Sequence, residues 1–229
     1  MTGTRWWSRT FPLARRTPYR EPVDFGTDPV RQELQAAIGG TWDELSRPGA
    51  WWDAGDRRAL ADAARAAFVG SPAADAGLPG AALEAAAVLA TRPATTTEAW
   101  VASVTDEIGE LRYLELVGLV ARVTAVDTFC RLLGREPEAL PEPVDGAPSL
   151  DPAPEGIRRN RTWVAMAMPV PPYVLGAVPS AMAAMNDLCE QLYMPPEEMG
   201  DPDWQRNALH RTEMELVAAT VSHENQCFY

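Results

Sequence analysis

The amino-acid sequence predicts an all-α protein. Alanine fills many of the apolar segments, and alanine has the highest helix propensity of all residues. No run of alternating β-branched residues indicates a strand, and Gly and Pro separate the apolar segments. Of the 229 residues, 46% are apolar and 23% are charged, which is typical of a globular chain that buries a sizeable core.

The first 40 residues are expected to form an irregular segment followed by one helix. Residues 1–27 are rich in Pro and Arg, with five Arg and no acidic residue among the first 20. We interpret them as a basic strap on an acidic body. The next helix is predicted to have Asp28 as its cap and Pro29 at its first position. Gly39 and Gly40 are expected to end it.

Three further helices are predicted before residue 110. The segment "DAGDRRALADAARAAFVG" is expected to be helical from about Gly55 and to stop at Gly70 and Pro72. The segment "LPGAALEAAAVLAT" is expected to start at Pro79. The segment "TTTEAWVASVTDE" forms the next predicted helix.

The longest predicted helix is "ELRYLELVGLVARVTAVDTFCRLLG". Gly134 is a suitable C-terminal stop, because glycine adopts the left-handed conformation that often ends helices. An apolar stripe along this helix predicts the face that packs on the core. Its members are Leu114, Val117, Val120, Ala121 and Thr124.

A proline-rich segment divides the chain. Residues 135–161 contain six Pro and no hydrophobic period, so they are expected to be a linker or a long surface strap between two halves. After this segment, one helix is predicted at about 179–193 and a final helix from about Thr212.

The two halves share an order of elements, which indicates a degenerate internal repeat. The segment "DRRALADAARAAF" of the first half corresponds to "TEMELVAATVSHENQCF" of the second. Residues 28–134 form the predicted first repeat and residues 162–229 the start of the second. Because the first half continues for about 70 residues beyond this helix, we expect the second repeat to be truncated.

Composition excludes several classes of function. A net charge of −12 repels phosphate backbones and argues against nucleic-acid binding. All basic residues are Arg, which excludes Schiff-base and P-loop mechanisms that need Lys. No apolar stretch is long enough to span a membrane or to form a signal peptide. The isolated cysteines Cys130, Cys189 and Cys227 form no disulfide framework, and we expect a cytoplasmic protein without a metal site.

The last helix carries the one motif that indicates chemistry. In "ELVAATVSHENQC", Glu215 lies twelve residues before Cys227. An acidic residue in an Ala- and Val-rich helix, then a Ser-x-x-Asn turn, then a Cys followed by an aromatic residue resembles the alkylhydroperoxidase D-like group of the carboxymuconolactone decarboxylase family. The resemblance covers roughly residues 28–229 and implies an all-α bundle of two degenerate repeats, of which the second is incomplete.

The resemblance also implies roles for individual residues. Glu215 matches the acid of the family, and Cys227 matches the first cysteine of its C-x-x-C motif. The second cysteine and a later histidine would stand at positions 230 and 234, and in the family the acid and the histidine relay protons to the cysteine pair. Some members have selenocysteine as the second group, encoded by UGA. We therefore expect that this chain was truncated at such a codon and that it is inactive as 229 residues.

Each of these residues also has a purely structural interpretation. Glu215 follows Thr212 by three residues, so the two could form a capping box, and this alternative stands equal to a proton relay. Cys130 and Cys189 are expected to be small core residues. His223 is expected to be a surface residue.

The resemblance predicts a thiol- or selenol-dependent peroxidase or disulfide reductase. Its partners would be a small peroxide and a thiol reductant, it would need no cofactor, and it is expected to be a homo-oligomer. Two alternatives remain open. One is a carboxymuconolactone decarboxylase-like enzyme that uses Arg, Glu and His without a cysteine pair, and the other is a non-catalytic helical interaction protein.

Overall fold

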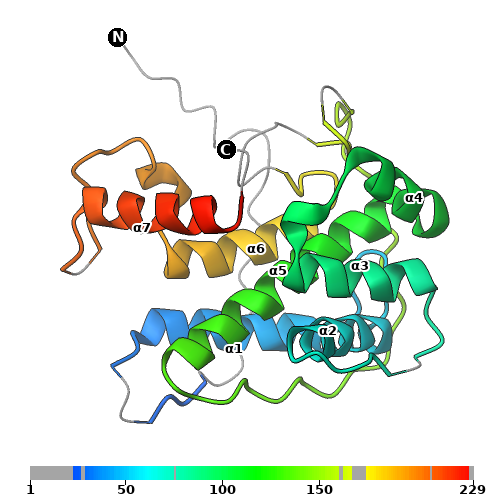
Figure 1. Cartoon of the computed structure of the whole chain (residues 1–229), viewed down its shortest axis with the longest axis horizontal. Coiled ribbons are helices and arrows are strands. Elements are labelled where there is room, and N and C mark those ends of the chain that lie inside the picture. Colours follow the sequence, from blue (N-terminus) through cyan, green and yellow to red (C-terminus); the bar gives the residue numbers. More distant parts are fainter. Residues whose placement is uncertain are drawn as a thin grey trace.

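The computed structural model describes residues 23–26, 29–74, 76–159, 162–166, 174–206 and 208–226. These residues form helices and connecting segments, with two isolated bridges and no strand (Figure 1). The all-α prediction is therefore confirmed for the described part of the chain. Its α-helices are α1 (Gln32–Leu45), α2 (Ala54–Phe68), α3 (Gly80–Thr91), α4 (Glu98–Ile108), α5 (Glu110–Leu132), α6 (Pro179–Leu192) and α7 (Arg211–Glu224). Two short 3-10 helices are η1 (Pro93–Thr95) and η2 (Pro196–Glu198).

Most helices begin at or next to the predicted residue, and side-chain caps fix the starts of α2 and α4. The carboxylate of Asp53 accepts a hydrogen bond from the Asp56 amide and caps α2. The Thr97 hydroxyl accepts one from the Trp100 amide and caps α4. Side-chain oxygens at this position satisfy amides that the first helical turn leaves without a partner. Such caps are readable from sequence because the partners lie three residues apart.

Helix α1 differs from the prediction at both ends. It begins at Gln32 with Arg31 as its N-cap residue and no side-chain cap, and Asp28 lies outside the described residues. It also continues through Gly39 and Gly40 to Leu45. A helix-interior glycine costs about 1 kcal/mol relative to alanine, and the burial of large apolar side chains beyond the glycines offsets this cost. Those side chains are Trp42 and Leu45.

Helix α5 runs through the middle of the molecule and packs against α1, α2, α3, α4 and α6 (Figure 1). Because neighbours surround it, its buried residues include Leu116, Leu119 and Val126 as well as Leu114 and Val120. The predicted single stripe is therefore too narrow. It is wrong for Ala121, which is exposed.

Alanines allow α2 and α3 to pack closely on one another. Ala61 and Ala64 of α2 and Ala82, Ala85 and Ala86 of α3 are all fully or almost fully buried. Small side chains at a helix contact shorten the distance between the axes, and the close approach recovers dispersion contacts that the small side chains would otherwise lack. The alanine richness of the sequence thus reflects packing as well as helix propensity.

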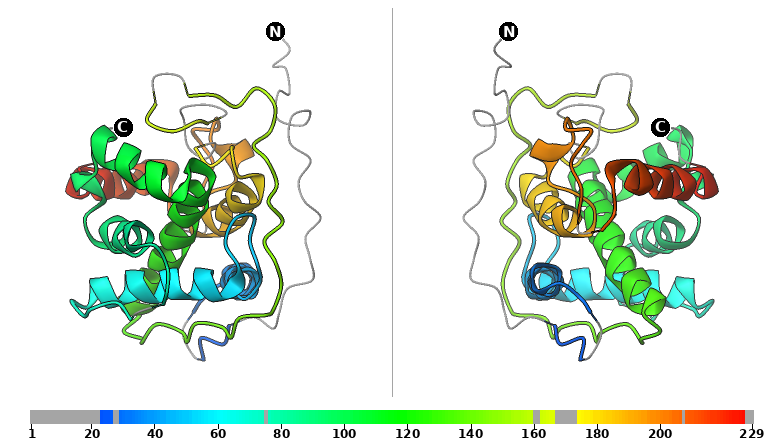
Figure 2. Two further views of the ribbon diagram at one scale, coloured as in Figure 1. Left: turned by 90° about the vertical axis from the view of Figure 1, so that its right-hand side faces the viewer. Right: turned by 90° about the vertical axis from the view of Figure 1, so that its left-hand side faces the viewer.

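The proline-rich segment 135–157 is a strap that follows the turn between α1 and α2 (Figure 2). The Val144 amide donates to the Ser46 carbonyl at 2.7 Å. The Leu150 amide donates to the Ala50 carbonyl at 2.8 Å. Leu140 is buried in the core. Of the two predicted possibilities, linker or strap, the described contacts favour the strap.

Helix α6 connects the second half of the chain to the first. It packs on α1 and α5, and Gly118 of α5 faces it closely. A Cβ atom at Gly118 would lie 2.9 Å from a Leu175 methyl and 3.4 Å from the Ala181 Cβ. The division into two repeats stays a prediction, because these contacts show only that the halves share a core.

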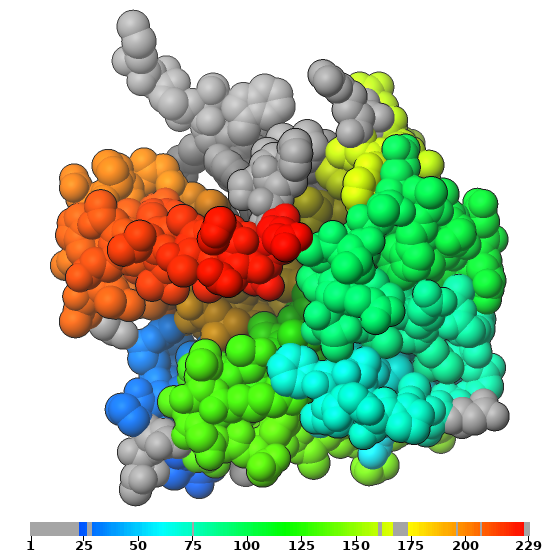
Figure 3. Space-filling model, viewed as in Figure 1, coloured from blue at the N-terminus to red at the C-terminus, as the bar shows by residue number. Residues whose placement is uncertain are grey.

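Helix α7 lies at the edge of the molecule (Figures 1 and 2). The space-filling view shows it on the surface, in orange to red (Figure 3). Of its residues only Met214 is buried. The side chains of Leu216, Val217 and Val221 face outward, with 68%, 60% and 54% of their surface exposed. Within the described residues, no helix has the length and apolarity needed to cross a bilayer.

Candidate functional site

Glu215 lies in the first half of α7, but it does not cap the helix. The N-cap residue is His210, whose Nδ1 accepts a hydrogen bond from the Thr212 amide at 3.3 Å. The Glu213 carboxylate completes the capping box by accepting from the His210 amide at 2.8 Å. The interpretation of Thr212 and Glu215 as the capping box is therefore wrong, because the box starts two residues earlier. Glu215 is left available for other contacts.

Two donors converge on one oxygen of the Glu215 carboxylate. The Tyr193 hydroxyl, at the C-terminal end of α6, donates to Oε1 at 2.7 Å. The Arg211 Nε, one turn earlier on α7, donates to the same atom at 2.6 Å. Among the described residues, no donor contacts Oε2, and 46% of the Glu215 side chain is exposed. We call Tyr193, Arg211 and Glu215 the Glu215 cluster.

The cluster changes the acidity of its members. The hydrogen bonds from Tyr193 and then Arg211 lower the pKa of Glu215 below its usual range, because both stabilise the charged carboxylate. Burial, together with the hydrogen bond to Glu215 and its charge, raises the pKa of Tyr193 to about 12. Glu215 is therefore a carboxylate at neutral pH and Tyr193 a protonated donor.

Arginines also order the connection between α6 and α7. The Arg211 guanidinium donates to the carbonyls of Glu198, Met199 and Asp201 at 3.1 to 3.3 Å. The Arg206 guanidinium donates to the Tyr193 carbonyl at 3.1 Å and to the Glu190 carbonyl at 2.7 Å. These bonds fix the backbone around both donors to Glu215. The position of its carboxylate thus depends on contacts between residues far apart in sequence.

The cysteines differ in how deeply they are buried. Cys227, the predicted redox residue, lies outside the described residues. Cys130 is fully buried against the core and Cys189 is half-buried. Burial raises the pKa of both thiols, with Arg122 acting in the opposite direction on Cys189. Neither environment favours a reactive thiolate. The interpretation of Cys130 as a small core residue is confirmed.

A second arginine–carboxylate cluster lies between α1, α2 and α5. The Glu44 carboxylate accepts from Arg57 Nη2 at 2.6 Å and from Arg122. The Arg57 guanidinium also donates to the Glu44 and Arg47 carbonyls and lies 3.5 Å from the Glu115 carboxylate. The Arg57, Arg122 and Glu115 side chains are at most 3% exposed. We call Glu44, Arg57, Glu115 and Arg122 the buried charged cluster.

Glu115 fits this cluster so tightly that only glycine can face it. A Cβ atom at Gly49 would lie 1.8 Å from Glu115 Oε1. The Trp51 amide donates to Oε2 at 2.6 Å. Burial raises the pKa of Glu115, although Arg57 and the Trp51 amide act in the opposite direction. Oε1 accepts no hydrogen bond within the described residues and lies near the Arg57 charge, and Arg122 adds a second, weaker attraction.

Glu44 behaves differently from Glu115. Burial alone would raise its pKa, but the charges of Arg122 and Arg57 and their hydrogen bonds outweigh this effect and lower the pKa to about 2. The sequence analysis missed this cluster. A usable signal was present, because Arg57 shares a helical stripe with Leu60 and Ala64, and a charge on an apolar stripe indicates a buried ion pair.

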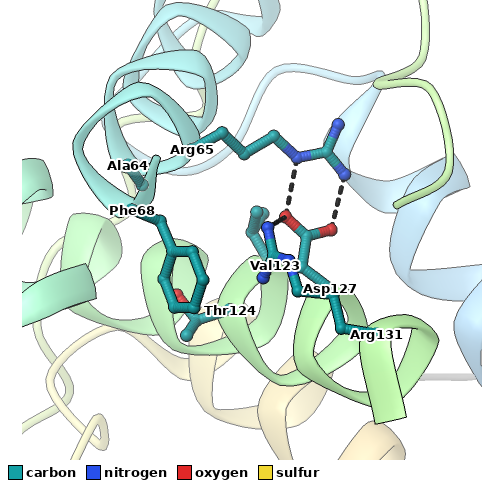
Figure 4. A pocket seen from close by; sticks show the side chains of 7 residues that line it. All are labelled: Ala64, Arg65, Phe68, Val123, Thr124, Asp127 and Arg131. Carbon is teal, nitrogen blue, oxygen red and sulfur yellow. Dashed lines mark hydrogen bonds and ion pairs between the residues drawn. The ribbon is translucent and has the colours of Figure 1, made fainter. Parts of the chain in front are cut away.

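The recess between α2 and α5 holds a third ion pair (Figure 4). The Arg65 guanidinium donates to both Asp127 oxygens at 2.8 and 2.6 Å. Arg131 lies 3.9 Å from the same carboxylate and covers the Phe68 ring at 4.1 Å. All charges in this recess are paired with one another. It offers no free acid, base or nucleophile to a ligand.

The described residues contain no group of three or more His, Cys, Asp or Glu side chains that could hold a metal ion. Comparisons with protein-family models, curated proteins and solved structures found no significant match to this chain. The resemblance to the alkylhydroperoxidase D-like group therefore stays a prediction based on the Glu215 and Cys227 motif.

Proposed function

We propose that the chain belongs to a thiol- or selenol-dependent redox enzyme that reduces small peroxides or disulfides. The observation that carries the proposal is the state of Glu215. Its carboxylate is not used to cap α7, it is ionised at neutral pH, and Oε2 is free of donors within the described residues. A half-exposed carboxylate with a free oxygen can accept a proton, and its lowered pKa makes it a weak base.

The proposed reaction needs two chalcogen groups. A thiolate or selenolate attacks the terminal oxygen of a peroxide, the O–O bond breaks, and the alkoxide leaves as an alcohol after it takes a proton. The product is a sulfenic or selenenic acid. The second thiol attacks it, a disulfide or selenenylsulfide forms, and water leaves. A dithiol reductant then restores the pair by exchange and is itself oxidised.

Cys227 and Glu215 have separate tasks in this scheme. Cys227 is the resolving thiol in this scheme, and the family pattern puts the attacking group three residues later in the sequence. Glu215 exchanges the protons that the attack and the resolution require. The Tyr193 and Arg211 contacts hold the Glu215 carboxylate in its charged form, and its second oxygen is the proton acceptor in this scheme.

The test adds one cysteine at position 230 and measures peroxide consumption with a dithiol, above the uncatalysed rate. The extended chain is expected to turn over and to form a disulfide between positions 227 and 230, detected by mass spectrometry. Cys227→Ser in the extended chain is expected to abolish turnover, because the sulfenic acid is no longer resolved within the chain. Cys189→Ser is the matched control and is expected to leave the rate unchanged.

Two results would contradict the proposal. One is turnover by the 229-residue chain at the rate of the extended chain, which would favour the enzyme that needs no cysteine pair. The other is the absence of turnover in every form together with stable self-association.

The outward apolar face of α7 favours that second outcome as the alternative function. Leu216, Val217 and Val221 are exposed apolar side chains on this helix, and clustered exposed apolar side chains mark interaction sites. A helical interaction protein that self-associates through α7 would use this face and would not need Glu215. Homo-oligomerisation is expected for the redox enzyme and for the interaction protein. Only the measurement of peroxide consumption distinguishes the two.

A further inference from the structure

We propose that Tyr193 is a positioning residue for Glu215: it holds one carboxylate oxygen from α6 and leaves the other as the oxygen that exchanges protons. This inference rests on the proposed function. Tyr193 comes from a different helix than Glu215 and lies 22 residues away in sequence. The motif that indicated Glu215 therefore contains no information on this contact.

The geometry separates the two carboxylate oxygens. Tyr193 and Arg211 donate to Oε1 at 2.7 and 2.6 Å, which are short distances typical of hydrogen bonds to a charged acceptor. The two donors approach from different elements, so rotation of the carboxylate would break both bonds at once. The orientation of Oε2 is fixed as a result, and Oε2 accepts no hydrogen bond from the described residues.

Tyr193 is itself fixed by the backbone around it. Its carbonyl accepts from the Arg206 guanidinium, and its amide donates to the Cys189 carbonyl at 2.8 Å. The phenol therefore cannot follow α7 if α7 moves. The contact ties the carboxylate to the packed helix α6 rather than to the largely exposed helix α7.

The contact also sets the protonation state of Glu215 over a wide range of pH. The charged or titratable groups that face the carboxylate are Tyr193 from α6 and Arg211 from α7 itself. Tyr193 keeps its proton up to about pH 12, and Arg211 stays charged throughout. At neutral pH the contact therefore joins a protonated phenol and a charged guanidinium to a charged carboxylate.

The test titrates the carboxyl groups of the 229-residue chain by NMR and compares wild type with Tyr193→Phe, which removes only the hydroxyl. The expected result is an upward shift of the Glu215 titration, because one donor to its charged form is lost. Glu213, the capping residue on the same helix, is the internal control and is expected not to shift. An unchanged Glu215 titration would overturn the inference.

A reciprocal measurement keeps the inference testable if the first variant is too unstable. Glu215→Gln removes the charge that helps to raise the Tyr193 pKa, so the titration of Tyr193 is expected to move down from about 12. The chain has five tyrosines, and site-specific isotope labelling of Tyr193 separates its titration from those of the others. No downward movement would count against the contact.

Measurements on the chain extended by a cysteine at position 230 test the proposed redox function and the role of Tyr193 separately. In it, Tyr193→Phe is expected to shift the acidic limb of the pH–rate profile upward, in parallel with the Glu215 titration. A shifted titration with no turnover in either chain would overturn the proposed function and support the positioning contact. Turnover with an unshifted titration and an unshifted profile would support the function and overturn the role of Tyr193.

Discussion

The buried charged cluster and the Glu215 cluster use the same chemical groups in different surroundings. In the first, Arg57, Arg122 and Glu115 are almost completely removed from water and join α2 and α5 to Glu44 of α1. In the second, the carboxylate of Glu215 is 46% exposed and belongs to a helix at the edge of the molecule (Figure 1).

The difference shows how burial separates structure from chemistry. Charges removed from water must be paired with one another, because an unpaired buried charge costs several kcal/mol. A carboxylate at the surface has no such requirement, and one of its oxygens can stay without a partner. Removal of one member of the buried charged cluster would therefore leave a buried charge unpaired, whereas Glu215 keeps one carboxylate oxygen without a donor among the described residues.

The largest effect is expected from Arg57→Met in the buried charged cluster. The change keeps much of the side-chain length, but it leaves Glu115 without its nearest positive charge, the Glu44 carboxylate without one of its two arginines and the Arg47 carbonyl without the Arg57 donor. We expect the free energy of unfolding to fall by roughly 3 to 5 kcal/mol, measured by urea denaturation.

Arg58→Met is the matched control for this variant. Arg58 is the next residue on α2, is 32% exposed and pairs with Glu142, which is 89% exposed. Removal of such a surface pair is expected to cost no more than about 1 kcal/mol. Equal losses for Arg57→Met and Arg58→Met would show that burial does not distinguish the two clusters in the way described.

A smaller effect on the free energy of unfolding is expected when the pH is lowered. The pKa of Glu44 is lowered from 4.5 to about 2 in the folded chain, so its contribution to stability is fully present above about pH 4.5 and is lost as the pH falls through 2. Urea midpoints measured across this window are expected to fall less steeply for Glu44→Gln than for wild type.

Glu115 has the opposite effect on stability to Glu44. Its pKa is raised, so its protonated form is favoured in the folded chain and its contribution to stability grows as the pH falls. Because the Glu44 charge helps to raise the Glu115 pKa, the comparison of wild type with Glu44→Gln reports the coupled response of both carboxylates. Parallel loss of stability in the two proteins between pH 4.5 and 2 would contradict the assignment of Glu44 as the carboxylate that the two arginines stabilise.

The sequence could predict features that depend on interactions between neighbouring residues. It could not predict features that depend on contacts between distant segments of the chain. Helix α2 was predicted from about Gly55 to the stop at Gly70, and the cap that fixes its start, Asp53, also lies within the segment. Helix α1 was predicted to end at Gly39 because propensity is local, whereas the burial of Trp42 that extends the helix depends on neighbours from other helices. Local signals therefore give helix positions more accurately than they give helix ends that packing decides.

The same limit applies to the candidate site. The motif gave Glu215, and the spacing of four residues could have indicated Arg211 as its partner. Tyr193 gave no signal, because its contact exists only after α6 and α7 have been brought together. The capping residue was misassigned because both Glu213 and Glu215 have a suitable residue three positions earlier, and geometry alone distinguishes His210 from Thr212.

The central claim is that Glu215 serves chemistry rather than the stability of α7. It is tested most directly by comparing Glu215→Gln with Glu213→Gln in the chain extended by a cysteine at position 230. Both variants replace a carboxylate by an amide on the same helix, and Gln still completes a capping box. The measurement is the rate of peroxide reduction together with the free energy of unfolding of each protein.

Glu215→Gln is expected to lower the rate by roughly 100-fold and to change the free energy of unfolding by less than about 1 kcal/mol, since the amide oxygen still accepts from Tyr193 and Arg211. Glu213→Gln is expected to leave both quantities nearly unchanged. The account would be contradicted if Glu215→Gln left the rate within about twofold of the unsubstituted chain while it destabilised the protein more than Glu213→Gln does.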